Sequence, residues 1–324
     1  MRITKRKVLV ILLIAAAIVY ITNSSRLAPS RDGAPLLLAH RGLAQTFHME
    51  GITNDTCTAE RIYAPEHPYL ENTIASMNVA FREGADIVEF DVQPTKDGRF
   101  VVFHDWTLDC RTNGAGVTRN HTAAELQALD IGYGYTADGG QTYPFRGKGI
   151  GLMPTLDEVL STFPDRSFLI HVKSNDPDEG AQLAQYLKTL PTNRLEQLTV
   201  YGGDQPVAAV KELLPGLRTM SKASLIRSLL TYEALGWTGF IPSSIEHTQI
   251  HIPEKYAPYL WGWPNRFLER MEKADTRVIV VGGDGSEFSH GFDTPEDVER
   301  LPRGYTGGIW TNRIDLIAPM YRGK

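Results

Sequence analysis

Two hydrophobic patterns alternate along the chain beyond position 34. Short apolar runs, such as PLLLAH at 35–40 and SFLIHVK at 167–173, are typical of buried strands. Other segments carry apolar residues at helical spacing, as TIASMNVAFREGA does at 73–85, where Gly84 stops the helix. Strands that alternate with helices indicate parallel βα units.

The number of expected strands points to a closed sheet. The strands are expected to end at His40, Asp91, His104, Lys173, Tyr201, Met220, Val281 and Trp310. Eight such strands predict an α/β fold of the (β/α)8 TIM-barrel class over residues 35–324. A doubly wound open sheet is the alternative, but no glycine-rich phosphate fingerprint follows the first strand.

Two long stretches interrupt this alternation. Residues 41–73 are rich in polar residues and proline, and connections of that length are usually functional or disordered. Residues 131–153 are rich in glycine and lack a clear hydrophobic period, so we expect a long surface loop there. Directly after it, Thr155 and Glu158 resemble a capping box at the start of a helix.

The N-terminal segment follows a different pattern. It carries four basic residues, Arg2, Lys5, Arg6 and Lys7. An uncharged apolar run from Val8 to Ile21 follows them, and this order is typical of the front of a secretory signal. The run is short for a full membrane span, which needs about 20 apolar residues.

Residues 1–34 therefore allow more than one interpretation. A cut after Ala28 would place Arg26 at the third position back, which is unfavourable for cleavage. We favour an uncleaved signal anchor followed by a linker, with a cleaved signal peptide and a buried core helix as alternatives. Either kind of signal places the barrel outside the cytoplasm, membrane-anchored or secreted, which means the periplasm in a bacterium.

Composition and charge narrow the class of protein. The 324 residues are 42% apolar and 22% charged, as in ordinary globular proteins. The formal charge of −5 argues against a nucleic-acid-binding protein, which normally has a basic face. An exported chain can keep a disulfide, so Cys57 and Cys110 predict one bridge, with two free thiols as the alternative. None of these properties defines an oligomeric state.

Ionisable residues gather at the expected strand ends, where β/α barrels place their active sites. They come from four successive strands: His40, then Glu89 and Asp91, then His104, then His171 and Lys173. Glu89 and Asp91 are two positions apart, so they face the same side and repel each other unless a cation lies between them. Their oxygen ligands suit Ca²⁺ or Mg²⁺. Alternatively, one of them pairs with an arginine or lysine across the barrel.

The two histidines at this rim predict acid–base chemistry. His40 and His104 form a candidate pair, because histidine can take both roles near neutral pH. Arg41 follows His40 directly, and its guanidinium suits a phosphate oxygen. A metal, an arginine and two histidines together indicate phosphodiester cleavage.

Several motifs occur in a characteristic order along the chain. They are AHRG at 39–42, the segment from ENT at 71–73 to HD at 104–105, TNGAGV at 112–117, MPTLDEVL at 153–160 and GIWTNRIDL at 308–316. In this order they resemble the glycerophosphodiester phosphodiesterase family over roughly residues 36–318. The resemblance implies a (β/α)8 barrel that hydrolyses glycerophosphodiesters to an alcohol and glycerol 3-phosphate with a divalent metal, usually Ca²⁺ or Mg²⁺.

The resemblance also implies roles for particular residues. His40 and His104 correspond to the catalytic histidines, and Glu89 and Asp91 to the two carboxylate ligands of the metal. Arg41 corresponds to the arginine that follows the first histidine, and we expect it to bind substrate.

The fourth expected strand departs from the family pattern. The family usually has Glu-x-Lys there, whereas this chain has IHVK at 170–173. Lys173 therefore matches as a substrate-binding residue, and His171 replaces the glutamate that completes the metal site. Histidine is a softer ligand without negative charge. Three interpretations follow: His171 binds the metal through nitrogen, Glu71 contributes, or the site accepts Mn²⁺ or Zn²⁺.

Three functions are compatible with these residues. Metal-dependent hydrolysis of glycerophosphodiesters leads. A phospholipase D-like or lysophospholipid-cleaving enzyme would share the fold and the metal but differ in its substrate pocket. A phosphodiester-binding module without activity would follow if His171 abolished metal binding.

Two further segments bear on the substrate. A bridge between Cys57 and Cys110 would hold the insert that follows His40 over the mouth of the barrel. The aromatic stretch YLWGWPNRF at 259–267 is either ordinary core or a hydrophobic wall near a membrane surface. The second reading suits a lipid-derived substrate and a membrane attached through the N-terminal segment.

Overall fold

Nine strands form one sheet in the computed structural model, which describes residues 5–29, 31–53, 56–286 and 290–323. They are β1 (Leu36–His40), β2 (Ile87–Pro94), β3 (Phe100–Val102), β4 (Ser167–Val172), β5 (Leu198–Gly202), β6 (Arg218–Ser221), β7 (Gln249–Pro253), β8 (Arg277–Val281) and β9 (Gly308–Thr311). Eight strands are parallel in the order β6-β5-β4-β2-β1-β9-β8-β7. An isolated bridge between Thr219 and Thr248 joins the two ends of this order. The predicted (β/α)8 barrel is confirmed as a nearly closed barrel.

One strand of the predicted eight is wrong. The segment that leads to His104 forms β3, which runs antiparallel to β2 outside the barrel order. The turn between them is tight, with Gly98 at φ 77°, and such a turn joins antiparallel strands, whereas parallel strands need a crossover. The missing barrel strand is β7, where Ile250 and Ile252 alternate with polar residues instead of forming a continuous apolar run.

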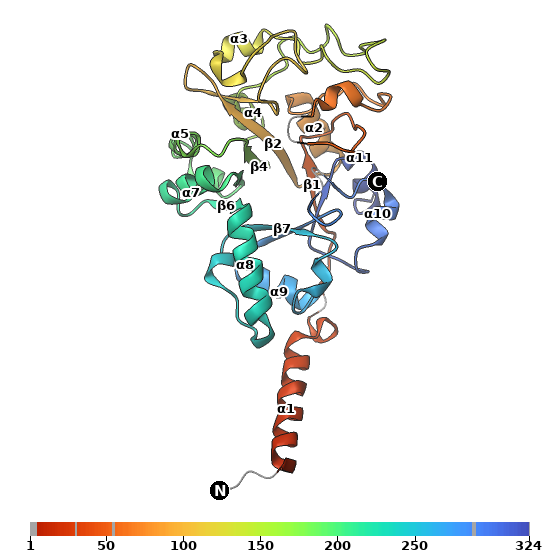
Figure 1. Ribbon diagram of the computed structural model, residues 1–324, viewed down its shortest axis with the longest axis vertical. Coiled ribbons are helices and arrows are strands. Elements are labelled where there is room, and N and C mark those ends of the chain that lie inside the picture. The colour runs from red at the N-terminus through yellow and green to blue at the C-terminus, as the bar shows by residue number, and fades with distance from the viewer. Residues whose placement is uncertain (1–4, 30, 54–55, 287–289, 324) are drawn as a thin grey trace.

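Most helices pack around the outside of the barrel, whereas the N-terminal helix does not. The α-helices of the described residues are α1 (Lys5–Asn23), α2 (Ile74–Glu83), α3 (Ala123–Gln127), α4 (Leu156–Thr162), α5 (Pro177–Leu187), α6 (Thr192–Leu195), α7 (Asp204–Leu213), α8 (Lys222–Leu235), α9 (Asn265–Lys273), α10 (Pro295–Glu299) and α11 (Ile314–Ile317). In Figure 1, α5, α7 and α8 follow one side of the barrel, and α10 and α11 follow the other. The expected capping box starts α4, where Thr155 and Glu158 accept each other's amide N–H.

Side chains alternate between the inside and the outside of the barrel along each strand. An apolar cluster in the interior consists of Leu38, Ile87, Leu169, Ile279 and Trp310. Two positions further along β1, β2 and β4 lie His40, Glu89 and His171, which therefore face the same interior. The period of the strands thus places polar side chains on top of an apolar base.

A second hydrophobic cluster lies beyond the barrel, at the end opposite α1 (Figure 1). Residues 131–153 form no helix or strand and are mostly exposed, as expected of a long surface loop, but Ile131, Tyr135, Phe145 and Met153 are buried in this cluster and anchor the loop. The spacing of these buried residues fits neither a helix nor a strand. The glycines between them let the backbone pack closely against neighbouring segments. A Cβ on Gly134, for example, would lie 1.8 Å from the carbonyl oxygen of Cys110.

The N-terminal helix α1 projects away from the barrel (Figure 1). It has 19 residues, none of them buried, and extends beyond the apolar run at both ends. By length and composition it can cross a membrane, although a signal sequence would pass the same test. The Asn23 side-chain amide donates to the Trp237 carbonyl at 2.7 Å, and Arg270 donates to the Thr22 carbonyl at 3.1 Å. These contacts join the C-terminal end of α1 to the barrel, before β1 begins at Leu36.

Candidate active site

Strand register brings the candidate residues together. His40 on β1 is paired with Glu89 on β2, and Asp91 is paired with His171 on β4. Because all four face the interior near the C-terminal strand ends, they form one group. We call the full set the catalytic rim: His40, Arg41, Glu89, Asp91, His104, His171 and Lys173. The structure thus brings together every catalytic, substrate-binding and metal-binding candidate from the sequence.

Glu89, Asp91 and His171 form a potential metal-binding group. Each offers a ligand atom, and these atoms lie within 4.8 Å of one another. Both carboxylates are fully buried. Burial and the neighbouring Asp91 raise the pKa of Glu89 to about 8, so a cation placed between the carboxylates would relieve a real electrostatic cost. This donor set fits a divalent metal.

The alternative pairing of a carboxylate with a cation is also present. Arg41 Nε lies 3.1 Å from Asp91 Oδ2, and Lys173 Nζ lies 3.9 Å from Asp91 Oδ1. Burial alone would raise the pKa of Asp91, but the Arg41 guanidinium holds it well below its usual range. Arg41 thus favours the ionised form of Asp91. Glu71 contacts guanidinium groups instead: Arg41 at 3.0 Å and Arg111 at 3.0 Å.

Arg41 is held in an unusual backbone conformation. Its φ of 57° lies in the left-handed region, which is costly for a residue with a side chain and often marks a functional site. Its amide N–H donates to Glu89 Oε2 at 3.2 Å. The turn after β1 therefore directs both the amide and the guanidinium of Arg41 at the carboxylate pair.

The two catalytic histidine candidates are both arranged to accept a proton. His40 Nδ1 lies 2.7 Å from the side-chain oxygen of Asn312, which requires a proton on Nδ1 and leaves Nε2 as the acceptor. Nε2 lies 3.7 Å from Glu89 Oε2. Burial, assisted by Arg41, lowers the pKa of His40 well below its ordinary value. His40 is therefore neutral at pH 7.

His104 is positioned by charged groups on both sides. Its Nδ1 lies 2.6 Å from Asp105 Oδ1, and its Nε2 accepts a hydrogen bond from Lys173 Nζ at 2.8 Å. Asp105 also accepts from Arg111 Nε at 2.8 Å. Burial lowers the pKa of His104. Although β3 is not a barrel strand, the hairpin it forms with β2 delivers His104 to the catalytic rim.

Two residues of the site were missed by sequence reasoning. Tyr201 donates its hydroxyl to Glu89 Oε1 at 2.7 Å, and its ring stacks on His171 with centroids 4.2 Å apart. Asn72 donates to Asp91 Oδ2 at 3.0 Å and accepts from the Asp91 amide at 3.1 Å. Tyr201 stands at an expected strand end, and Asn72 stands in the quoted ENT motif, so both positions carried a signal.

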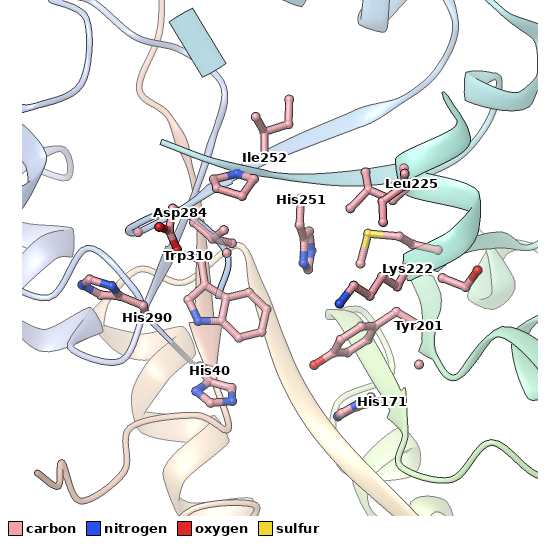
Figure 2. A pocket seen from close by; sticks show the side chains of 18 of the residues that line it. His40, His171, Tyr201, Lys222, Leu225, His251, Ile252, Asp284, His290 and Trp310 are labelled. Atoms are coloured by element: carbon pink, nitrogen blue, oxygen red, sulfur yellow. The ribbon is translucent and has the colours of Figure 1, made fainter. Parts of the chain in front are cut away.

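A cavity of about 900 Å³ opens above the catalytic rim. Figure 2 shows Trp310 beside His40 and Tyr201 beside His171, with Leu225 of α8 on the upper side. The ring centroids of His40 and Trp310 are 4.8 Å apart. The rim therefore forms one end of a larger space that extends toward α8.

The insert after His40 also reaches this cavity. Phe47 and Ile52 contribute to its lining. Cys57 and Cys110 form a disulfide between the insert and the segment that follows β3. The bridge ties the insert to the second hydrophobic cluster and so fixes it beside the mouth.

Known proteins share sequence and fold with this chain. Residues 40–208, just over half of the chain, match the model of the Glycerophosphoryl diester phosphodiesterase family. A glycerophosphodiester phosphodiesterase from Bacillus subtilis is 40% identical over 124 residues, 37% of this chain and 39% of that protein. One from Caldanaerobacter subterraneus is 43% identical over 103 residues, 32% of this chain and 39% of that protein. The matched segments thus span about two fifths of these relatives' length.

Solved structures share the fold over most of the chain. A glycerophosphoryl diester phosphodiesterase domain from Mycobacterium tuberculosis has a TM-score of 0.62 at 19% identity, covering 89% of this chain and 99% of that one. An Oleispira antarctica phosphodiesterase in complex with the product sn-glycerol-3-phosphate has a TM-score of 0.54 at 20% identity, covering 89% and 97%. At these identities the likeness establishes the barrel fold.

Proposed function

Because the chain belongs to the glycerophosphoryl diester phosphodiesterase family, we propose that it hydrolyses glycerophosphodiesters to an alcohol and glycerol 3-phosphate. One observation carries the proposal: two neutral, oriented histidines line one cavity beside the group formed by Glu89, Asp91 and His171. In the net reaction the water oxygen bonds to phosphorus and the P–O bond to the alcohol breaks. The water proton passes to the leaving alkoxide.

His40 and His104 divide the proton transfers in this proposal. Either histidine, with its proton on Nδ1, can take the proton from the nucleophile at Nε2, and in His104 the hydrogen bond from Lys173 to Nε2 must first be released. The other, once protonated, supplies a proton to the leaving oxygen. Arg41 and Lys173 contribute positive charge beside the phosphate, which lowers the energy of the more negative transition state.

Glu89, Asp91 and His171 would hold a divalent metal. The metal would supply positive charge to the phosphoryl oxygens. Two carboxylates favour Ca²⁺ or Mg²⁺, and the nitrogen of His171 extends the choice to Mn²⁺ or Zn²⁺. Tyr201 and Asn72 position the two carboxylates by hydrogen bonding.

We further propose a division of the chain at residue 34. Residues 1–34 anchor the protein through α1, and residues 35–324 form the enzyme outside the cytoplasm. The apolar helix and the disulfide both support this arrangement, since disulfides persist in oxidising compartments.

Release of glycerol 3-phosphate from glycerophosphocholine tests the proposal. The full chain, purified in detergent, is first treated with a chelator and then supplied with Ca²⁺, Mg²⁺, Mn²⁺ or Zn²⁺ in turn. His104→Ala should abolish metal-dependent release, whereas His121→Ala, outside the cavity lining, should retain it. Binding of glycerophosphocholine without turnover under any metal would overturn the proposal in favour of a non-catalytic phosphodiester-binding protein.

A further inference from the structure

The cavity has an apolar side that glycerophosphodiester hydrolysis does not explain. One face of α8 contributes Leu225, Ile226, Leu229 and Leu230, which we call the α8 wall. Tyr256, Tyr259 and Leu260 line the same cavity from the segment after β7. A glycerol phosphate and a small alcohol are polar and do not need such a surface. The cavity, at about 900 Å³, is near the upper end of the usual range for small-molecule pockets, about 300–1,000 Å³.

The α8 wall is exposed to an extent that suggests a ligand. Ile226 is 47% exposed and Leu230 is 65% exposed. Tyr259, which lines the same cavity, is 75% exposed. Large apolar side chains that gather around one cavity expose a contiguous hydrophobic surface, and such surfaces usually mark a binding site.

The outer end of this wall lies beside the N-terminal helix. After α8 the chain turns through Gly236–Thr238, where the Trp237 carbonyl accepts the hydrogen bond from Asn23 at the end of α1. Leu235, Trp237 and Phe240 are 43%, 44% and 49% exposed there. In Figure 1 the lower end of α8 lies near the point where α1 leaves the barrel. An exposed tryptophan beside the end of a membrane helix is typical of the membrane–water interface.

These observations connect the catalytic rim to a membrane surface. We propose that the substrates of this site are glycerophosphodiesters that carry one acyl chain, the lysophospholipid class, drawn from the membrane that holds α1. The phosphate lies at the catalytic rim, and the acyl chain lies along the α8 wall. This inference rests on the proposed function and names its substrate class.

The shape of the apolar surface favours a single chain. The wall is one face of one helix, and the segment Tyr256–Leu260, which leads into Trp261 hydrogen-bonded to α8, adds to the same cavity lining. From Leu225 to Leu230 the helix rises about 7.5 Å, at 1.5 Å per residue, and the charged Glu233, one turn beyond Leu229, follows on the same face. The bond cleaved is unchanged: water adds to phosphorus, the headgroup alcohol leaves with a proton, and the acylated glycerol phosphate remains.

Paired substrates test this inference with the full chain. The protein is reconstituted in vesicles of phosphatidylethanolamine and phosphatidylglycerol, so that released choline reports only on the added substrate. Lysophosphatidylcholine, glycerophosphocholine and diacyl phosphatidylcholine are supplied separately with the activating metal. We expect the highest kcat/KM for lysophosphatidylcholine, because only this substrate fills both the rim and a single apolar groove.

A charge on the α8 wall provides the matched variant. Ile226→Glu should lower kcat/KM for lysophosphatidylcholine by about tenfold or more, because the acyl chain would have to desolvate a carboxylate. The kcat/KM for glycerophosphocholine should change by less than about twofold. The control is Ile150→Glu, an isoleucine that is 62% exposed outside the cavity lining.

The outcomes separate the two proposals. Two results would overturn the acyl-chain inference and leave the proposed hydrolase activity in place. One is turnover of glycerophosphocholine with equal or lower activity on lysophosphatidylcholine. The other is an equal loss of both activities in Ile226→Glu. Diacyl phosphatidylcholine as the best substrate would overturn the single-chain assignment. Absence of turnover on all three substrates would overturn the proposed function and the inference together.

Discussion

The catalytic rim and the α8 wall face the same cavity but are built in opposite ways. The rim consists of buried charged and polar side chains near the ends of strands, and each contacts several of the others. Asp91, for example, contacts Arg41, His171 and Asn72. The wall consists of half-exposed apolar side chains on a helix, without hydrogen bonds between them. A change in the rim must therefore disturb several partners, whereas a change in the wall alters one contact surface. Chemistry and substrate choice are thus assigned to separable regions.

Loss of a rim histidine should give the largest effect. Replacement of His40 or His104 by alanine removes a proton-transfer group, so kcat should fall by about 100- to 10,000-fold. Initial rates on lysophosphatidylcholine and glycerophosphocholine measure this. Both substrates should lose activity by the same factor, in contrast to Ile226→Glu, and a selective loss on one substrate would contradict the division between rim and wall.

The disulfide should contribute mainly to stability. The bridged cysteines are 53 residues apart, and closing a loop of that length in the unfolded chain accounts for about 4 kcal/mol in the chain-entropy description. Cys57→Ser combined with Cys110→Ser should therefore lower the free energy of unfolding by several kcal/mol, measured by denaturant titration. Reduction of the wild-type protein should reproduce the loss, and no change in stability would show that other packing holds the insert.

Tyr201 should tune the metal site through its contacts with two residues of the rim. Tyr201→Phe keeps the ring stacked on His171 but removes the hydroxyl that donates to Glu89. Loss of such a supporting hydrogen bond typically weakens metal affinity by about 10- to 100-fold. Titration of the activating metal against activity measures the shift. Tyr133→Phe, on an exposed tyrosine outside the cavity lining, is the control and should leave the titration unchanged.

Asp105 should make the protein sensitive to acid. Burial alone would raise its pKa, but Arg111 and His104 hold the pKa of Asp105 below its ordinary value of about 3.9. The unfolded chain therefore binds this proton more readily, so the stabilisation is present above about pH 4 and is lost as the pH falls through and below that value. In Asp105→Asn, Tm measured from pH 7 down to pH 3 should decline less steeply than in the wild type. An unchanged slope would assign acid sensitivity to other carboxylates.

The comparison of rim and wall also shows what sequence reasoning could and could not reach. The rim was predictable because its residues follow strands with a period of two, which places Glu89 and Asp91 on one face. His104 was placed at the rim for a wrong reason, as the end of a barrel strand, because local pattern does not distinguish a hairpin arm from a parallel strand. The partners of Glu71 were not predictable, since Arg111 reaches it from 40 positions further along the chain.

The sequence by itself determined the alternation of strands and helices, the apolar N-terminal segment and the identity of the ionisable groups at the strand ends. These properties depend on residues that are close together in the chain. Tertiary structure decided which strands close the barrel, which guanidinium neutralises which carboxylate, and that α8 lines the same cavity as His40. Those outcomes depend on packing between distant segments. Burial strengthens the interactions between charges at the rim, and packing places a polar site and an apolar wall in one cavity.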